Sequence, residues 1–303
     1  MKEEIYELLP PKIKACFLNQ RICAKDLQEI RFRLGQPIII KYKNKEYFLS
    51  KCGGFSTDDQ NLYELTQKEM RQVLEYISNY SLYAYEDQLK QGFITLKGGH
   101  RVGIAGKVVL DHEDIKTMQY ITFLNIRIAH EIQGCGDKVF PLCRKNNKLL
   151  SVLIISPPGC GKTTLLRDLI RLGSSCGQTI GLVDERSEIA ACYQGVPQNN
   201  IGIRTDVIDG CPKAQGFQML VRSMSPDLVA VDEIGRKEDV DAIEYGLHCG
   251  CGVLATVHGN SMKTIPYYDR LKNLFQRFIF LDAKNQVGHV SKILDEEENQ
   301  ILC

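Results

Sequence analysis

Ser156–Thr164, with the sequence SPPGCGKTT, is the stretch that decides the fold. It directly follows the apolar run Leu149–Ile155, which indicates a buried strand. It opens the segment Leu165–Arg171, whose leucines and isoleucine recur at helical spacing. A glycine-containing loop between a strand and a helix is the context that a phosphate-binding loop, or P-loop, requires. The sequence therefore predicts a nucleotide-binding α/β domain built around this loop.

The residue types in this loop suit phosphate. Gly159 and Gly161 allow backbone conformations closed to other residues, so that successive N–H groups can turn toward an anion at a helix N-terminus. Lys162 would bring positive charge to the β- and γ-phosphates, and the Thr163 hydroxyl would ligate Mg²⁺. The usual pattern begins with glycine, whereas this chain has Ser156. The residues expected to bind ATP are Pro158, Gly159, Cys160, Gly161, Lys162, Thr163 and Thr164.

The composition is typical of a soluble globular protein. The chain has 303 residues, of which 44% are hydrophobic and 25% charged, and this length is enough for two domains. The net charge of +1 gives no overall attraction to nucleic acid or anionic lipid. The twelve cysteines are scattered without a C-x-x-C pair, and no signal peptide is evident, which favours a reducing cytoplasm. No apolar run approaches the roughly 18 residues of a membrane span, so any membrane association is expected to be peripheral.

Residues 1–145 predict a smaller mixed α/β domain. A capping box of Thr66 and Glu69 marks the start of a helix. Alternating or apolar segments predict strands near residues 29–34, 38–40, 46–49, 92–96, 100–109 and 123–128. Gly, Pro, Asn and Lys cluster between Gly134 and Lys148, which is where we expect the domain boundary.

Residues 146–303 predict a second domain in which buried strands alternate with helices. This pattern is typical of a mostly parallel sheet with helices on both faces. The expected strands lie near residues 150–155, 179–183, 227–231, 252–257 and 276–281, and the expected helices near 162–172, 212–223 and 238–248.

Three strand ends in this domain carry polar residues suited to hydrolysis. Pro226–Glu233 is an apolar strand followed by two carboxylates, so Asp232 is expected to hold the Mg²⁺ hydration shell and Glu233 to polarise the attacking water. Gly181–Glu188 also ends in acidic residues, and a solvated strand-to-helix turn is the alternative interpretation there. Val253–Asn260 ends with Thr256 and His258, which are placed to sense the γ-phosphate or report its loss.

Hydrolysis in oligomeric NTPases often needs an arginine from outside the loop. Each arginine taken alone is also a candidate for a surface ion pair. The candidates are Arg31, Arg33, Arg101 and Arg127 in the first domain and Arg204, Arg222 and Arg236 in the second.

Taken in order, these blocks resemble the stage III sporulation protein AA family of endospore-forming bacteria, a branch of the secretion and traffic ATPases. The resemblance covers most of the chain, and six ordered blocks are more specific than any single motif. The blocks are residues 156–168, 183–188, 204–209, 222–227, 231–236 and 255–260, with residues 29–37 and 98–106 in the first domain.

The resemblance implies a RecA-like ATPase domain after a smaller domain that serves regulation and oligomerisation. It also implies a homohexamer with ATP near the interface between the two domains. In the wider family an aspartate box matches Asp184–Glu188 and a histidine box matches His258. The family usually has Gly-Glu where this chain has Asp232-Glu233, which leaves the choice of catalytic base open. The residues expected to act in catalysis are Glu233, Glu188, Glu185, His258 and Arg236, and the expected metal ligands are Thr163 and Asp232.

The function implied is an ATP-hydrolysing motor that energises or assembles a channel-like complex of membrane proteins during endospore formation. It would act in the cytoplasm of the mother cell, peripherally at the membrane around the forespore. A nucleic-acid translocase or helicase is the alternative, since RecA-like cores serve both functions. The near-neutral charge and the lack of a basic and aromatic stripe disfavour nucleic acid as a partner. Intact Lys162, Thr163, Asp232 and Glu233 disfavour a scaffold that binds nucleotide without hydrolysing it.

Overall fold

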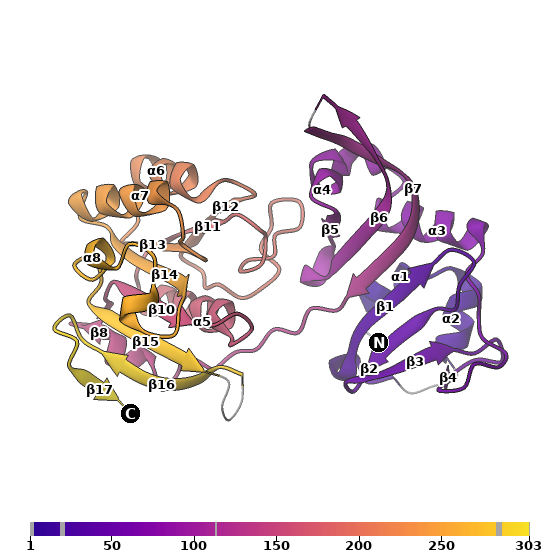
Figure 1. Ribbon diagram of the computed structural model, residues 1–303, viewed down its shortest axis with the longest axis horizontal. Helices are drawn as coiled ribbons and strands as arrows, with labels where there is room; N and C mark the ends of the chain where they lie inside the picture. The colour runs from indigo at the N-terminus through magenta and orange to yellow at the C-terminus, as the bar shows by residue number, and fades with distance from the viewer. Residues whose placement is uncertain (1–2, 19–21, 113, 283–286, 303) are drawn as a thin grey trace. The chain divides into compact units, whose positions relative to one another are not determined.

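The chain forms two large sheets, one in each of two compact units, Met1–His130 and Glu131–Cys303 (Figure 1). The computed structural model describes residues 3–18, 22–112, 114–282 and 287–302. Among these residues, no helix has the length and apolar character needed to cross a bilayer.

The first unit is a seven-stranded antiparallel sheet in the order β4-β3-β2-β1-β7-β6-β5. Its strands are β1 (Leu27–Arg33), β2 (Ile39–Tyr42), β3 (Lys45–Leu49), β4 (Phe55–Ser56), β5 (Phe93–Thr95), β6 (Arg101–Asp111) and β7 (Asp114–Arg127). Its helices are α1 (Glu3–Glu7), α2 (Pro11–Leu18), α3 (Gln67–Ile77) and α4 (Glu86–Lys90). The predicted capping box at the start of α3 is confirmed, because the Thr66 hydroxyl accepts from the Glu69 N–H and the Glu69 carboxylate accepts from the Thr66 N–H.

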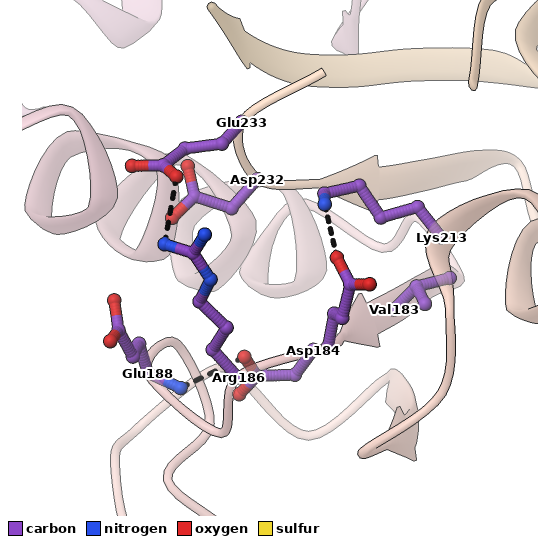
Figure 2. A pocket seen from close by; sticks show the side chains of 8 residues that line it. Val183, Asp184, Arg186, Glu188, Lys213, Asp232 and Glu233 are labelled. Carbon is purple, nitrogen blue, oxygen red and sulfur yellow. Dashed lines mark hydrogen bonds and ion pairs between the residues drawn. The ribbon is translucent and has the colours of Figure 1, made fainter. Parts of the chain in front are cut away.

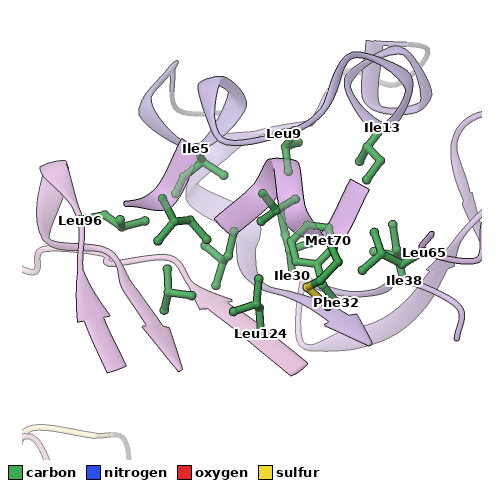
Figure 3. Packing of buried hydrophobic residues seen from close by; sticks show 14 of the residues in the cluster. Ile5, Leu9, Ile13, Ile30, Phe32, Ile38, Leu65, Met70, Leu96 and Leu124 are labelled. Atoms are coloured by element: carbon green, nitrogen blue, oxygen red, sulfur yellow. The ribbon is translucent and has the colours of Figure 1, made fainter. Parts of the chain in front are cut away.

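Alternation along β1 decides which face of this sheet is buried. Ile30 and Phe32 are fully buried, whereas Arg31, between them in the chain, is exposed. Apolar residues of the N-terminal helical segments pack over the buried face, as Figure 3 shows for Ile5 and Leu9. The mixed α/β character predicted for this part of the chain is therefore confirmed.

The second unit is an eight-stranded sheet in the order β12-β11-β13-β14-β10-β15-β16-β17. Its strands are β10 (Val152–Ser156), β11 (Ile180–Asp184), β12 (Thr205–Asp209), β13 (Leu228–Val231), β14 (Gly252–His258), β15 (Arg277–Asp282), β16 (His289–Leu294) and β17 (Gln300–Leu302). Its helices are α5 (Lys162–Ser175), α6 (Lys213–Ser223), α7 (Lys237–His248) and α8 (Tyr268–Leu271), and the short strands β8 (Arg144–Lys145) and β9 (Lys148–Leu149) pair separately. The six strands β10 to β15 are parallel to one another, whereas β16 and β17 are antiparallel. The mostly parallel sheet was therefore predicted correctly.

Strand β10 is buried on both faces of this sheet. Val152 and Ile154 belong to the core that includes α5, whereas Leu153 and Ile155 belong to the core that includes α6 and α7. The helices lie on opposite sides of the sheet accordingly (Figure 1). Burying one such side chain contributes about 1.5–3 kcal/mol, so the strand is held firmly from two directions.

The segment before β10 folds with the second unit, whereas the sequence places the boundary at residues 145/146. Val139, Phe140 and Cys143 are buried in the same core as α5. The Gly136 N–H also donates to the Asp168 carboxylate at 2.7 Å. The glycine and proline signals mark a turn-rich segment here, but its apolar residues still anchor it to the helix that follows the loop.

Candidate active site

The P-loop is the turn between β10 and α5, and its glycines are required. Gly161 is the residue before α5 and has φ = +91°, and Gly159 has φ = +76°. A Cβ on Gly161 would lie 3.2 Å from the backbone of Gly288, whose N–H donates to the Cys160 carbonyl at 2.9 Å. Both the left-handed conformation and the close approach of this second segment therefore select glycine.

Ser156, the departure from the usual pattern, is explained by its backbone. It is the last residue of β10 and is fully buried, with strand conformation that needs no glycine. Its hydroxyl donates to the Pro157 carbonyl at 2.9 Å. A serine at this position therefore leaves the course of the loop unchanged.

An open cavity of about 550 Å³ lies over the P-loop. Its lining residues are Pro158, Gly159, Gly161, Lys162, Thr163, Thr164, Arg186, Glu233, His258 and Val287. All the predicted nucleotide-binding residues are among them except Cys160. The side chain of Cys160 points into the core beneath the loop and is 4% exposed.

Asp232 lies directly after β13 and joins the P-loop to β14. The Thr163 hydroxyl donates to Asp232 Oδ2 at 2.8 Å, and the Thr256 hydroxyl donates to Oδ1. Thr256 in turn accepts the N–H of Glu233 at 2.8 Å. The sequence places Thr256 as a phosphate sensor, but its side chain is fully buried and orients Asp232 and Glu233 instead.

Glu233 reaches the P-loop cavity from a strained backbone. Its φ of +51° lies in the left-handed region, which costs a residue with a Cβ about 1–2 kcal/mol. Its carboxylate contacts Arg186 Nη1 through Oε2 at 3.0 Å and His258 Nε2 through Oε1 at 3.3 Å. Such strain at the edge of a cavity is typical of a functional residue.

His258 connects Glu233 to Lys162. The Lys162 ammonium lies 3.0 Å from His258 Nδ1 and donates to the carbonyls of Ser156 and Pro157 at 3.3 and 3.1 Å. An imidazole with its proton on Nε2 suits both neighbours, because Nδ1 then accepts from Lys162 while Nε2–H faces the Glu233 carboxylate at 3.3 Å. Burial lowers the pKa of Lys162, and the nearby carboxylates of Glu233 and Asp232 partly offset this.

Two residues of the aspartate box, Asp184 and Glu185, make different kinds of contact. Asp184, at the end of β11, is 2% exposed and accepts the N–H groups of Glu188, Ile189 and Ala190 at 2.9, 3.0 and 2.8 Å. Glu185 forms an ion pair with Lys213. Asp184 therefore shapes the turn that follows β11.

A second cavity, of about 20 Å³, adjoins the aspartate box. Glu185 and Glu188 line it together with Arg186 and Glu233, as Figure 2 shows for the labelled side chains. The described residues around the P-loop cavity include neither Glu185 nor Glu188. Of the three candidate bases, Glu233 is thus the one placed at the loop.

The buried Asp184 carboxyl makes folding stability depend on pH. Burial raises its pKa to about 6, and the three backbone hydrogen bonds only partly oppose this. Since the ordinary value is about 4, the folded state binds the extra proton between these two pH values. The contribution of Asp184 to the free energy of unfolding therefore falls as pH rises from about 4 to about 6, by up to about 3 kcal/mol.

Urea unfolding of the wild type and of Asp184→Asn across this pH range tests the effect. We expect the difference in unfolding free energy, wild type minus variant, to grow as pH falls from about 6 to about 4. Asp227→Asn is the matched control, because a backbone hydrogen bond from Thr179 lowers the pKa of Asp227. Its difference should stay constant from about pH 6 to about pH 4 and shrink only as pH falls below about 4. A difference for Asp184→Asn that stays constant with pH would contradict the assignment.

The seven arginines that the sequence names as candidates lie outside the lining of the P-loop cavity, as far as the structure describes it. Arg236 is exposed at the start of α7, and Arg204 donates to the Ser174 carbonyl at 3.1 Å. Arg222 lies 5.8 Å from the centre of the Tyr245 ring, and Arg31 pairs with Glu29 at 2.7 Å. Arg33, Arg101 and Arg127 lie in or at the end of strands β1, β6 and β7 of the first unit.

The sequence pattern alone assigns no role to two residues at the site, Arg186 and Val287. It also does not predict the hydrogen bond from Thr256 to Asp232. The signal for Arg186 is its position at the carboxyl end of a parallel strand, directly after two acids. No comparable signal marks Val287, which comes from the segment between the antiparallel strands β15 and β16.

Two solved structures share this fold over most of the chain. The pilus retraction motor PilT with bound ADP matches with a TM-score of 0.54 at 16% identity, covering 84% of this chain and 74% of that one. The ATPase DotB of Legionella pneumophila matches with a TM-score of 0.50 at 17% identity, covering 84% and 72%. The chain therefore shares the fold of these two proteins, and the predicted α/β architecture is confirmed.

Sequence comparison narrows the class to one family. A family model described as "Sporulation stage III, protein AA" matches residues 1–301. "Stage III sporulation protein AA" of Bacillus subtilis (strain 168) is 39% identical over 307 residues, which is 98% of this chain and 96% of that protein. The "Uncharacterized protein ycf45" of Porphyra purpurea is 28% identical over 87% of this chain and 41% of its own length. The chain belongs to the stage III sporulation protein AA family.

Proposed function

We propose that this chain is an ATP-hydrolysing motor of the secretion type. The observation that carries the proposal is the 2.8 Å hydrogen bond between Thr163 and Asp232, with Glu233 directly after Asp232 in the P-loop cavity. The helix after the loop meets there the end of β13, which is separated from β10 by β14. A hydroxyl, a carboxylate and a second carboxylate in this arrangement are the parts that nucleoside triphosphate hydrolysis requires.

The side chains present fit ATP and Mg²⁺. Hydroxyl and carboxylate oxygens are the ligands that Mg²⁺ prefers, and Thr163 and Asp232 supply them. Lys162 supplies positive charge for the β- and γ-phosphates, and the N–H groups of the loop stand at the N-terminus of α5. Mg²⁺, when bound, neutralises the charge that develops on the phosphate oxygens.

We assign Glu233 as the group that orients the attacking water and takes its proton. It lines the P-loop cavity, whereas Glu185 is held by Lys213 in the adjoining one. The His258 ring lies 3.3 Å from one carboxylate oxygen of Glu233, and it also contacts Lys162. His258 is thus placed to report changes at the γ-phosphate to β14.

The family supports a finer proposal about the cellular role. We propose a homohexamer in the mother-cell cytoplasm, peripheral at the membrane, that energises or assembles a membrane channel or secretion complex during endospore formation. The name of the Bacillus subtilis relative supports the link to sporulation, and the shared fold with the pilus retraction motor PilT supports the link to a motor. The regulatory and oligomerising role of the first unit, and an arginine such as Arg236 supplied by another copy, stay predictions.

ATP turnover by the full chain tests the proposal. We expect hydrolysis that requires Mg²⁺, stops on chelation with EDTA, and changes by less than about twofold when single-stranded DNA is added. Strong stimulation by DNA would favour the translocase instead. No turnover by the assembled full chain, with Mg²⁺ and ATP in excess, would contradict the proposal.

A further inference from the structure

Arg186 lies where the two cavities of the second unit adjoin. Among the described lining residues, Arg186 and Glu233 are the pair common to both cavities. The Arg186 guanidinium contacts Glu233 Oε2 through Nη1 at 3.0 Å. Figure 2 shows the side chain extending from its turn across to the Glu233 carboxylate. A residue of the aspartate box with no role assigned from the sequence therefore touches the proposed base.

The turn that carries Arg186 is fixed by its own hydrogen bonds. Asp184 accepts three backbone N–H groups from residues 188–190. Arg167, on α5, donates to the carbonyls of Ile189 and Glu188 at 2.7 and 2.6 Å. The Ser187 hydroxyl donates to Asp209 at 2.6 Å. The backbone that carries Arg186 is thus fixed, although the Arg186 side chain itself is 63% exposed.

Glu233 needs such a partner. Its carboxylate follows a left-handed backbone, and the surrounding strand ends fix only the N–H, through Thr256. The carboxylate itself is held on one oxygen by His258 and on the other by Arg186. A hydrogen bond to one oxygen and a close polar contact with the other restrict the orientation of the side chain, and Arg186 supplies the permanent positive charge of the two partners.

We infer that Arg186 is a positioning residue for hydrolysis, which holds the Glu233 carboxylate in the P-loop cavity and acts through it alone. The inference rests on the proposed function and names a residue that this function requires. A base held in one orientation contributes through proximity, and its loss of order lowers turnover without lowering nucleotide affinity. Arg186→Ala should therefore reduce kcat by about 10- to 100-fold while the Kd for ATP changes by less than about threefold.

Three variants of the full chain separate this role from a general loss of structure. Arg186→Lys keeps the charge but not the planar fork, so it should recover part of the lost kcat. Added guanidinium ion should restore part of the turnover of Arg186→Ala. Arg270→Ala is the control, because it removes an arginine from a carboxylate pair with Glu244 in the same unit and lies outside both cavity linings. The control should keep wild-type turnover.

A double-mutant cycle with Glu233→Gln decides whether Arg186 acts through Glu233. Single-turnover rates are measured for the wild type, both single variants and the double variant. If Arg186 only positions Glu233, the double variant is no slower than Glu233→Gln alone, within about twofold. If the two losses multiply, or if Arg186→Ala weakens ATP binding tenfold, Arg186 acts on the nucleotide and the inference is overturned. Failure of the proposed function looks different, because the wild type and Arg270→Ala would then lack turnover as well.

Discussion

Lys162→Ala is expected to abolish ATP binding, with a loss of affinity of about 100-fold or more and no detectable hydrolysis. Lys162 is 5% exposed, and its ammonium is held among the carbonyls of Ser156 and Pro157 and the His258 ring at the floor of the P-loop cavity. The side chain is therefore already in place for the phosphates. Titration with a fluorescent ATP analogue measures the affinity.

The fold should survive this change. Lys162→Ala releases the carbonyls of Ser156 and Pro157 but removes no side chain from the hydrophobic cores on the two faces of the sheet. Thermal unfolding followed by circular dichroism should therefore show the two units intact. Lys272→Ala, which removes a surface ammonium 3.4 Å from Asp269, is the matched control and should bind ATP normally. Unchanged affinity in Lys162→Ala would rule out this loop as the nucleotide site.

Glu233→Gln is expected to bind ATP normally and to hydrolyse it at least about 100-fold more slowly. The amide keeps the size of the side chain and an oxygen for the His258 contact, but it cannot take a proton from water. Pre-steady-state hydrolysis and ATP affinity, measured on the same preparation, separate the two effects. The variant should accumulate as an ATP complex.

Glu185→Gln and Glu188→Gln are the matched comparisons. Both line the adjoining cavity, and Glu185 is held by Lys213, so each change should slow hydrolysis by less than about tenfold. If Glu188→Gln proves the more damaging of the three changes, Glu188 is the base and the assignment of Glu233 is wrong.

The parts of the site that the sequence predicts are contiguous in the chain. A strand, a glycine loop and a helix follow one another at the P-loop, and an apolar run ends in two acids at Asp232. Such local order needs no knowledge of how strands align. The parallel sheet follows in the same way, because apolar runs alternate with helical patterns from Leu149 onward.

The contacts that the sequence misses depend on register between distant strands. Val231 pairs with Ala255 across β13 and β14, which brings the next residues, Asp232 and Thr256, together. A shift of one residue would turn Thr256 to the opposite face of the sheet. The register of parallel strands is set by the packing of the whole domain, so no local sequence pattern predicts the contact between Asp232 and Thr256.

The unit boundary and the sheet edge are missed for a related reason. Phe140 and Cys143 are buried against α5, but a few apolar residues among glycines and prolines carry no period. Strands β16 and β17 join the sheet by antiparallel pairing beside β15, outside the alternation of strands and helices from which the sheet was predicted. In both cases tertiary contacts decide what the local sequence leaves open.

The two-sided burial of β10 has a mechanical consequence for the proposed motor. Strand β10 is packed against one hydrophobic core on each face, so it cannot slide or tilt without disrupting one of them. The P-loop that follows β10 is therefore expected to stay fixed while other segments move. In the proposed motor, the force that follows phosphate cleavage would then pass through the polar links around the P-loop. Those links are the His258 ring on β14, the anchored turn after Asp184, and the backbone hydrogen bond from Gly288 to Cys160. We therefore expect the movement of the proposed motor at these strand ends and not within the sheet.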